Sequence, residues 1–151
     1  MISKKTKYAL NALVYLARQY QKGPILISEI AENEGIPKKF LELILLDLKN
    51  NGILQSKKGK GGGYFLGRSP AEIIIGRVIR IFDGPLAPVS CASQTAYHHC
   101  EECRDENTCG IRAVMKDVRT AIASILDKTT LEDMVERSAN LDQMKIHNYS
   151  I

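Results

Sequence analysis

The chain has 151 residues, of which 44% are hydrophobic and 25% are charged, and its formal net charge is +4. A chain of this length can form one domain, or a small domain with an extension, around a core that needs no disulfide framework. With only four cysteines and no apolar run of membrane-spanning length, it is predicted to be cytoplasmic and to have no membrane partner.

The charge is divided unevenly along the chain. Residues 1–70 carry a net charge of +7, and residues 71–151 carry −3. A basic N-terminal part joined to an acidic C-terminal part predicts a module that binds a polyanion, attached to a second functional element.

The first two predicted elements are helices. Apolar side chains recur over residues 8–20 at the spacing of one helix face. After a break at Gly23-Pro24, Ser28 is predicted to cap a brief helix over residues 29–33.

A turn at Gly35 leads to another predicted helix, which begins at Pro37 and ends at a left-handed Gly52. Its predicted buried residues are Phe40, Leu41, Ile44, Leu45 and Leu48. Two short helices joined by a glycine-containing turn are typical of a helix-turn-helix, although an ordinary helical hairpin fits this stretch equally well.

Two short predicted strands, residues 53–56 and 64–66, flank a basic loop. The loop, residues 57–63, contains three lysines and four glycines. Because glycine has an entropic cost, we expect that the loop backbone approaches a ligand closely and that the lysines meet phosphates. These features predict the wing of a winged helix-turn-helix, with a merely flexible basic turn as the alternative.

Six motifs follow one another over about residues 1–84. They are Tyr8-Ala-Leu10 with Leu16-Ala17, Ile30-Ala31, Phe40-Leu-Glu42, Leu48-Lys-Asn-Asn-Gly52 and Ser56-Lys-Lys-Gly-Lys-Gly-Gly-Gly-Tyr64. In these motifs, most specifically at the wing, the chain resembles the Rrf-type (IscR/NsrR/RirA/CymR-like) family of dimeric winged-helix transcriptional regulators. The resemblance implies a mainly α-helical fold with a small β-wing, a winged helix-turn-helix domain and a long dimerisation helix.

The resemblance also implies how this domain binds double-stranded DNA. The helix that begins at Pro37 would enter the major groove, where Glu42 could accept from a cytosine amino group or be an ordinary surface charge. Lys58 stands where IscR-like wings have an arginine, which suits a narrow minor groove better, so the wing lysines could contact phosphates alone. The residues implied to contact DNA are Lys38, Lys39, Glu42, Lys57, Lys58, Lys60, Gly61 and Gly62.

The C-terminal half is predicted to supply a dimer. Residues 71–83 are apolar almost all round, which predicts a buried helix, although three consecutive isoleucines would also suit a strand. A long helix is predicted to run to about Leu126, and we expect its apolar stripe to join two protomers that read a pseudo-palindromic operator. The stripe consists of Ile111, Met115, Val118, Ile122 and Ile125. A short helix is predicted over residues 131–137. The tail that follows it is expected to fray beyond Leu141.

This organisation divides the chain into five predicted parts. They are a winged helix-turn-helix domain (1–68), a buried helix with a connector (69–90), a cysteine-rich sensor loop (91–110), a dimerisation helix (111–128), and a short helix with a flexible tail (129–151). The first part is expected to bind DNA and the third to sense a signal.

All four cysteines, Cys91, Cys100, Cys103 and Cys109, lie within nineteen residues. Thiolates select iron–sulfur clusters or zinc, and the spacing of the second and third cysteines also suits a thiol–disulfide switch. In the IscR-like pattern a histidine stands three residues after the last cysteine, but here that residue is Arg112. The resemblance therefore implies two ligand sets: Cys91, Cys103 and Cys109 with Cys100 as the replacement, or Cys91, Cys100 and Cys109 with Cys103 free.

His98 and His99 are further candidate ligands, although adjacent histidines are more often exposed loop residues.

No phosphate-binding glycine motif and no readable Cys/His catalytic pair is present, so the sequence does not predict an enzyme. The leading hypothesis is a repressor that senses iron–sulfur status, redox state or nitric oxide through a 2Fe–2S or 4Fe–4S cluster. The alternatives are a zinc-stabilised or metal-free thiol-switch regulator, and an interaction module that binds no DNA and has a structural zinc loop.

Overall fold

The structure is a computed structural model that describes residues 2–149, so the outermost residues of the first and last predicted parts lie outside it. Its helices are α1 (Lys4–Arg18), α2 (Ile27–Glu34), α3 (Lys38–Asn50), α4 (Ile75–Asp83), α5 (Gly110–Leu126) and α6 (Leu131–Tyr149). Three 3₁₀ turns are η1 (Pro70–Glu72), η2 (Ser90–Ala92) and η3 (Glu106–Thr108). The strands β1 (Leu54–Lys57) and β2 (Gly63–Leu66) pair antiparallel, with Leu54 opposite Leu66.

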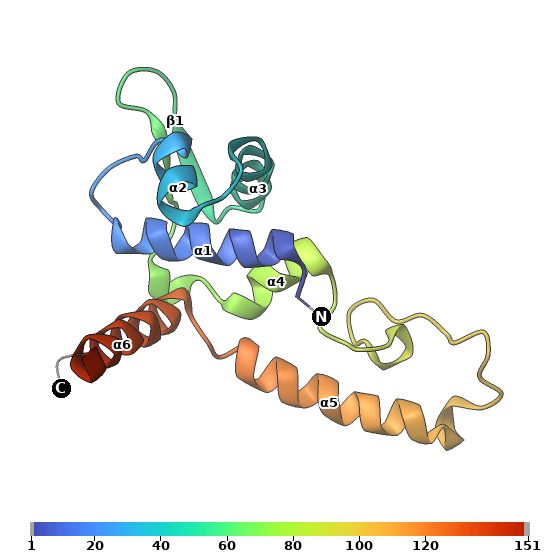
Figure 1. Cartoon of the computed structure of the whole chain (residues 1–151). Coiled ribbons are helices and arrows are strands. Elements are labelled where there is room, and N and C mark those ends of the chain that lie inside the picture. The colour runs from blue at the N-terminus through green and yellow to red at the C-terminus, as the bar shows by residue number, and fades with distance from the viewer. Residues whose placement is uncertain (1, 150–151) are drawn as a thin grey trace.

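The helices pack around α1, which crosses the middle of the molecule (Figure 1). The helices α2 and α3 and the β-hairpin lie on one side of α1, and α4 and α6 lie on the other side. Leu13, Leu48 and Val78, from α1, α3 and α4, are fully buried in one continuous core. The predicted mainly α-helical fold with a β-wing is therefore confirmed. Among residues 2–149, no helix combines the length and the apolar character that crossing a bilayer requires.

The helix-turn-helix prediction needs two corrections, one in each of its helices. The helix α2 begins one residue before Ser28, and Leu26 occupies its N-cap without a side-chain hydrogen bond. Phe40 is 37% exposed instead of buried, because it lies on the flank of α3 and contacts the ring of Tyr8 edge-on, with 5.6 Å between the ring centroids. The predicted left-handed Gly52 is confirmed, with φ of 75°.

The three consecutive isoleucines are not part of one helix, which corrects the predicted helix over 71–83. Ile73 accepts a hydrogen bond from the amide of Leu131 at 2.8 Å, and Ile75 donates to Thr129 at 2.9 Å. Ile74 lies opposite Thr130 in an antiparallel bridge. Ile73 and Ile74 are extended because the backbone here pairs with the connection between α5 and α6, and α4 begins at Ile75.

The last helix is longer than predicted. The helix α6 continues to Tyr149 instead of ending near residue 137. Arg18 in α1 anchors its middle, donating to the hydroxyl of Ser138 at 2.7 Å and lying 4.0 Å from the carboxylate of Asp142. This tertiary contact has no counterpart in the local sequence pattern.

A polar cluster ties the start of α1 to the end of α4. The carboxylate of Asp83 accepts from the buried hydroxyl of Thr6 at 2.7 Å and from the amide of Ser3 at 3.0 Å. Burial alone would raise the pKa of Asp83, but the hydrogen bonds from Ser3 and Thr6 outweigh it and hold this pKa below its ordinary value. The cluster lies at the point where the chain leaves the domain for the cysteine loop.

Asp83→Asn is expected to remove the pH-dependent contribution of this carboxylate to the free energy of unfolding. Because the folded pKa is lowered, the carboxylate stabilises the fold fully above about pH 4, and this contribution is lost as the pH falls through the folded pKa. We expect the variant to lose about 1.5 kcal/mol of unfolding free energy at pH 7, and less at a pH below the ordinary pKa of an aspartate. Urea unfolding at both pH values checks this, with exposed Asp117→Asn as control. An equal deficit at both pH values would contradict the assignment.

Candidate nucleic-acid interface and cysteine loop

The helix α3 divides into a buried and an exposed face. Leu41, Ile44, Leu45 and Leu48 form the buried face and are inaccessible to solvent. Lys38, Lys39 and Glu42, the predicted reading residues, are all exposed. The side chains predicted to meet DNA therefore project away from the core, next to the β-wing.

The wing is shaped by its glycines. Gly59 and Gly61 have positive φ of 87° and 72°. A side chain at Gly62 would overlap the carbonyl oxygen of Lys57, and one at Gly63 would overlap the carbonyl oxygen of Ile25. Gly62 and Gly63 are thus required by the protein's own backbone, and the close approach of the loop to a ligand stays a prediction. Lys57, Lys58 and Lys60 remain exposed around this turn.

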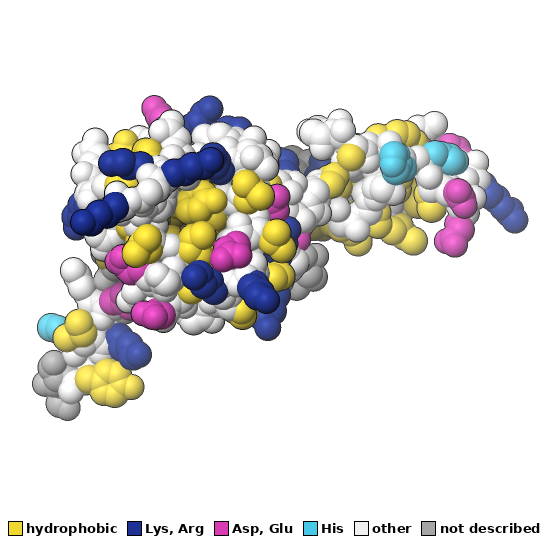
Figure 2. Space-filling view, turned by 90° about the horizontal axis from the view of Figure 1, so that it is seen from above, with side chains coloured by type: hydrophobic (Ala, Val, Ile, Leu, Met, Phe, Trp, Pro, Cys, Tyr) yellow, Lys and Arg dark blue, Asp and Glu magenta, His cyan; other side chains and the backbone are white. Residues whose placement is uncertain are grey.

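An open groove of about 460 Å³ separates α3 from the wing. Lys38 and Glu42 on one side face Lys57, Lys58 and Gly62 on the other. Four of the five predicted residues named here are charged, and three of the charges are positive. Figure 2 shows the same face from above, with apolar side chains gathered at its centre and Lys and Arg side chains on both sides of them.

The groove also contains residues that the sequence analysis missed. Lys49 lies seven residues after Glu42, so helical periodicity could have identified it. Ser28 and Tyr64 come from the start of α2 and from β2. No local pattern marks these two, because the pairing of Tyr64 with Ile25 brings them to α3.

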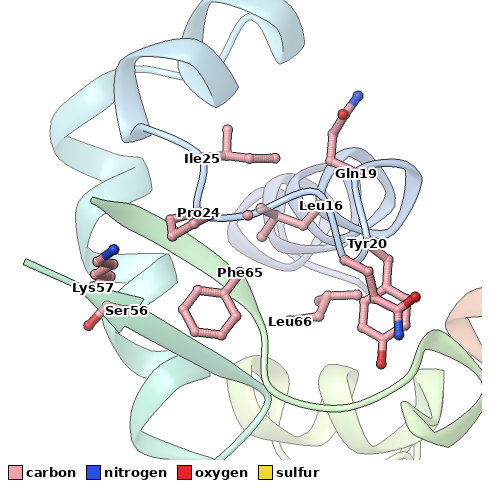
Figure 3. A pocket seen from close by; sticks show the side chains of 11 residues that line it. Leu16, Gln19, Tyr20, Pro24, Ile25, Ser56, Lys57, Phe65 and Leu66 are labelled. Atoms are coloured by element: carbon pink, nitrogen blue, oxygen red, sulfur yellow. The ribbon is translucent and has the colours of Figure 1, made fainter. Parts of the chain in front are cut away.

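A second, apolar cavity lies behind the wing (Figure 3). It measures about 630 Å³, and its walls include Leu16 of α1, Tyr20 of the turn that follows α1, Pro24 and Phe65. Lys57 also reaches its rim. This cavity is separate from the charged groove and contains none of the other predicted DNA-contacting residues.

Three of the four cysteines lie near one another. The thiols of Cys103 and Cys109 interact directly, and Cys100 lies close enough to act on Cys103 electrostatically. Partial burial, together with the neighbouring Cys109 and Cys100, raises the pKa of Cys103. Cys100 and Cys103 bracket a tight turn closed by a 3.1 Å backbone hydrogen bond. Cys91 is buried, in η2.

Arg112 organises the base of the loop. Its Nε donates to the carbonyl of Cys91 at 3.0 Å, and its guanidinium lies 3.7 Å from the carboxylate of Glu106. Its backbone amide donates to the sulfur of Cys109 at 3.5 Å. The residue that replaces a histidine in the family pattern therefore links the first and last cysteines structurally.

Glu106 is the polar centre of the loop. Its carboxylate accepts from the hydroxyl of Tyr97 and from Nδ1 of His99, the latter at 2.6 Å. The hydrogen bonds from Tyr97 and His99, with the charge of Arg112, lower the pKa of Glu106. The ring of His98 contacts the carbonyl of Tyr97, its backbone amide donates to the carbonyl of Ser90 at 3.3 Å, and the residue is exposed. Both histidines are exposed loop residues in this structure.

The cysteine sulfurs of the loop are suitable ligands for a metal ion or a cluster, but they are not arranged around a common point. Cysteine sulfur is the ligand that iron–sulfur clusters and zinc prefer. Within residues 2–149, however, no three Cys, His, Asp or Glu side chains converge in a metal-binding arrangement.

The predicted dimer stripe of α5 lies open on the single chain. Ile111 and Ile125 are 69% and 63% exposed, and Val118 is also exposed. Met115 and Ile122 are half-buried. The helix projects from the body beside the cysteine loop (Figure 1), and it contains no buried residue.

Comparisons with known proteins agree with this architecture. Residues 2–137 match the model of the Rrf2 family, described as "Iron-dependent Transcriptional regulator". The chain is 44% identical over 138 residues to an rrf2-like HTH-type transcriptional regulator of Rhodobacter capsulatus, which covers 89% of this chain and 92% of that protein. It is 34% identical over 133 residues to the HTH-type transcriptional regulator CymR of Bacillus subtilis, which covers 88% of each.

Solved structures give the same result. The chain is similar to the structure of CymR, the global cysteine regulator of B. subtilis, with a TM-score of 0.76, 32% identity and coverage of 91% of this chain and 97% of that one. It is also similar to IscR of T. potens, with a TM-score of 0.72, 28% identity and coverage of 91% and 88%. These relatives are transcriptional regulators and not enzymes. The chain belongs to the Rrf2 family of transcriptional regulators.

Proposed function

We propose that this regulator binds double-stranded DNA with α3 in the major groove and the wing beside it. The lysine-lined groove between α3 and the β-hairpin is the observation that carries the proposal. Exposed lysines on both walls suit a polyanion such as duplex DNA better than an uncharged partner. The alternative of an interaction module that binds no DNA is not favoured by any feature of this face.

We further propose that two copies associate through α5. An exposed stripe of heptad-spaced apolar side chains, represented by Ile111, Val118 and Ile125, is costly in water and typical of a helix pair. A two-fold axis through α5 would present two α3 helices to a pseudo-palindromic operator.

Contacts within the chain join α5 to the reading helix. Arg80 of α4 forms a two-pronged ion pair with Asp127 after α5, at 2.6 and 2.9 Å. One turn earlier, Arg77 donates to the backbone carbonyl of Asn51, which caps α3, at 2.9 Å. A rotation of α5 would therefore pull on α4 and shift α3, which is a route by which the loop could alter DNA binding.

The cysteine loop is proposed to hold an iron–sulfur cluster of either two or four irons, which would supply a redox-active, oxygen- or nitric-oxide-reactive centre. Support comes from the clustered thiols, from the iron dependence in the family description, and from relatives named IscR, one of which is 31% identical over 141 residues. Cys91, Cys100, Cys103 and Cys109 are the candidate ligands. Arg112 cannot coordinate, and together with Arg119, which donates to the carbonyl of Ala92 at 2.7 Å, it holds η2 against α5.

A metal-free thiol switch is the second candidate. The direct contact between the thiols of Cys103 and Cys109 favours it, as does the similarity to CymR proteins, one structure of which is of an oxidized form. A structural zinc ion would use the same thiols, so metal content separates the three proposals.

Protein purified without oxygen is expected to be brown, with broad visible absorption and with iron and acid-labile sulfide. Cys91→Ser and Cys109→Ser are expected to lose most of the iron, because both thiols belong to both ligand sets. Comparing Cys100→Ser with Cys103→Ser identifies the remaining ligand. His98→Ala is the matched control and should keep its iron. A colourless protein with one zinc ion per chain, or with no metal and a disulfide after oxidation, would contradict the cluster.

A further inference from the structure

We propose that Leu43 and Leu46, on the outward face of α3, recognise thymine bases through the 5-methyl group in the major groove. This inference rests on the proposed binding of DNA by α3, and it adds the chemical feature of the operator that the helix reads.

The two leucines are apolar, yet no other part of the chain covers them. Leu43 is 58% exposed and Leu46 is 46% exposed, and neither packs against the hydrophobic core. They lie between Lys39 and Asn50 on one line along α3. The order is Lys39, Leu43, Leu46 and Asn50, at spacings of four, three and four residues. This line lies opposite the buried face, so the two leucines lie at the centre of the surface that α3 presents outward.

The surroundings of these leucines favour DNA as the occupant. Lys38, Lys39 and Lys49 are exposed on the same helix, and the wing contributes the exposed Lys57 and Lys58 to the groove beside α3. Figure 2 shows apolar side chains gathered on the upper face of the molecule, with Lys and Arg side chains on both sides of them. A second copy would bring the same positive charges into opposition, which is unfavourable, whereas a polyanion with an apolar feature at its centre complements both parts of the surface.

Only one such feature exists on the base edges of the major groove. Guanine, cytosine and adenine present hydrogen-bonding atoms there, whereas thymine also presents a methyl group. A leucine has no hydrogen-bonding group, so it can discriminate only by burying apolar surface against that methyl. Glu42, beside Leu43, has the complementary chemistry for a cytosine amino group.

Helix geometry fixes the spacing of the recognised bases. Leu43 and Leu46 are three residues apart, which is about 4.5 Å along the helix axis. Consecutive base pairs are about 3.4 Å apart. The two side chains therefore face neighbouring base pairs, and each half-site is expected to contain two adjacent base pairs with thymine on either strand.

The experiment compares thymine with uracil, which lacks only the methyl group. Duplexes with high affinity for the wild-type protein are selected from a random pool, and each thymine in a half-site is replaced in turn by deoxyuridine. We expect about a four-fold loss of affinity at two neighbouring positions, corresponding to one buried methyl each. Leu43→Ala should bind the thymine duplex more weakly and lose its preference for thymine over uracil at one of these positions, and Leu46→Ala should do so at the other.

Leu141→Ala is the matched control, because Leu141 is an equally exposed leucine (65%) on α6, away from the groove. It should keep the full thymine preference. Thermal unfolding of all three variants should match the wild type, since the leucines lie outside the core. Equal affinity for thymine and uracil at every position, selected half-sites without thymine, or unchanged binding by both α3 variants would each overturn the inference while leaving sequence-selective DNA binding intact. A wild-type protein that binds no duplex would overturn this inference and the proposed function together.

Discussion

Replacing Lys57 and Lys58 together with glutamate is expected to reduce the affinity for duplex DNA by at least about 100-fold. Both side chains are exposed on the wing and line the groove opposite α3. Each lysine that meets a phosphate releases a bound cation from the DNA, and a glutamate in its place repels the phosphate. Binding to short duplexes at several salt concentrations measures the effect.

The salt dependence separates this mechanism from damage to the fold. Neutral Lys57→Gln/Lys58→Gln is expected to lower the slope of log affinity against log salt by about two. The control is Lys128→Glu/Lys145→Glu, which makes the same change of net charge after α5 and on α6, away from the wing. If the wing reversal left the affinity and the slope unchanged, or if the control weakened binding equally, the proposed DNA surface would be wrong.

Gly63→Ala is expected to destabilise the protein by about 3 kcal/mol and to impair DNA binding as well. A methyl group here would overlap the carbonyl of Ile25 and approach the amide of Leu26 to 2.9 Å, and the φ of Gly63 is 144°. The neighbouring Tyr64 exchanges two 2.8 Å backbone hydrogen bonds with Ile25, and these attach the wing to the start of α2. The substitution must disrupt this attachment, because backbone atoms cannot move aside as a flexible side chain can.

Gly59→Ala provides the matched control for this prediction. Gly59 also has a positive φ, but a methyl group there would meet no atom within 4 Å. Backbone strain alone should therefore reduce the unfolding free energy by about 1 kcal/mol. Urea unfolding measures both variants. Equal losses for the two would show that the close approach to Ile25 does not hold the wing in place.

Local patterns were sufficient for the DNA-binding part of the fold. The apolar repeat of α3 identified four of its buried side chains, and Gly52 ended the helix as predicted. The strand pair was placed to within a residue at each end, because turn-forming glycines interrupt two short apolar segments. The exception, Phe40, shows the limit of periodicity, since a residue on the edge of the stripe is buried or exposed according to its neighbour, here Tyr8.

Segments distant in sequence decided the remaining structure. Ile74 is extended because it pairs with Thr130, and α6 is anchored through Arg18. Thr130 and Arg18 are both far in sequence from the segments that they contact. Local propensity therefore predicted a continuous helix over residues 71–83 and a helix that was too short in place of α6. The groove likewise depends on the pairing of Tyr64 with Ile25, which brings β2 next to the start of α2.

The sequence by itself determined the class of protein and the location of its chemistry: a winged helix-turn-helix with a basic wing, and four thiols in one loop. These properties depend on residue type and short-range spacing, which are written directly in the chain. Only the tertiary structure decided that Arg112 links Cys91 to Cys109, and that two leucines lie exposed on the outward face of α3. The reason is that burial and side-chain contact depend on the packing of whole elements against one another, which no single segment specifies.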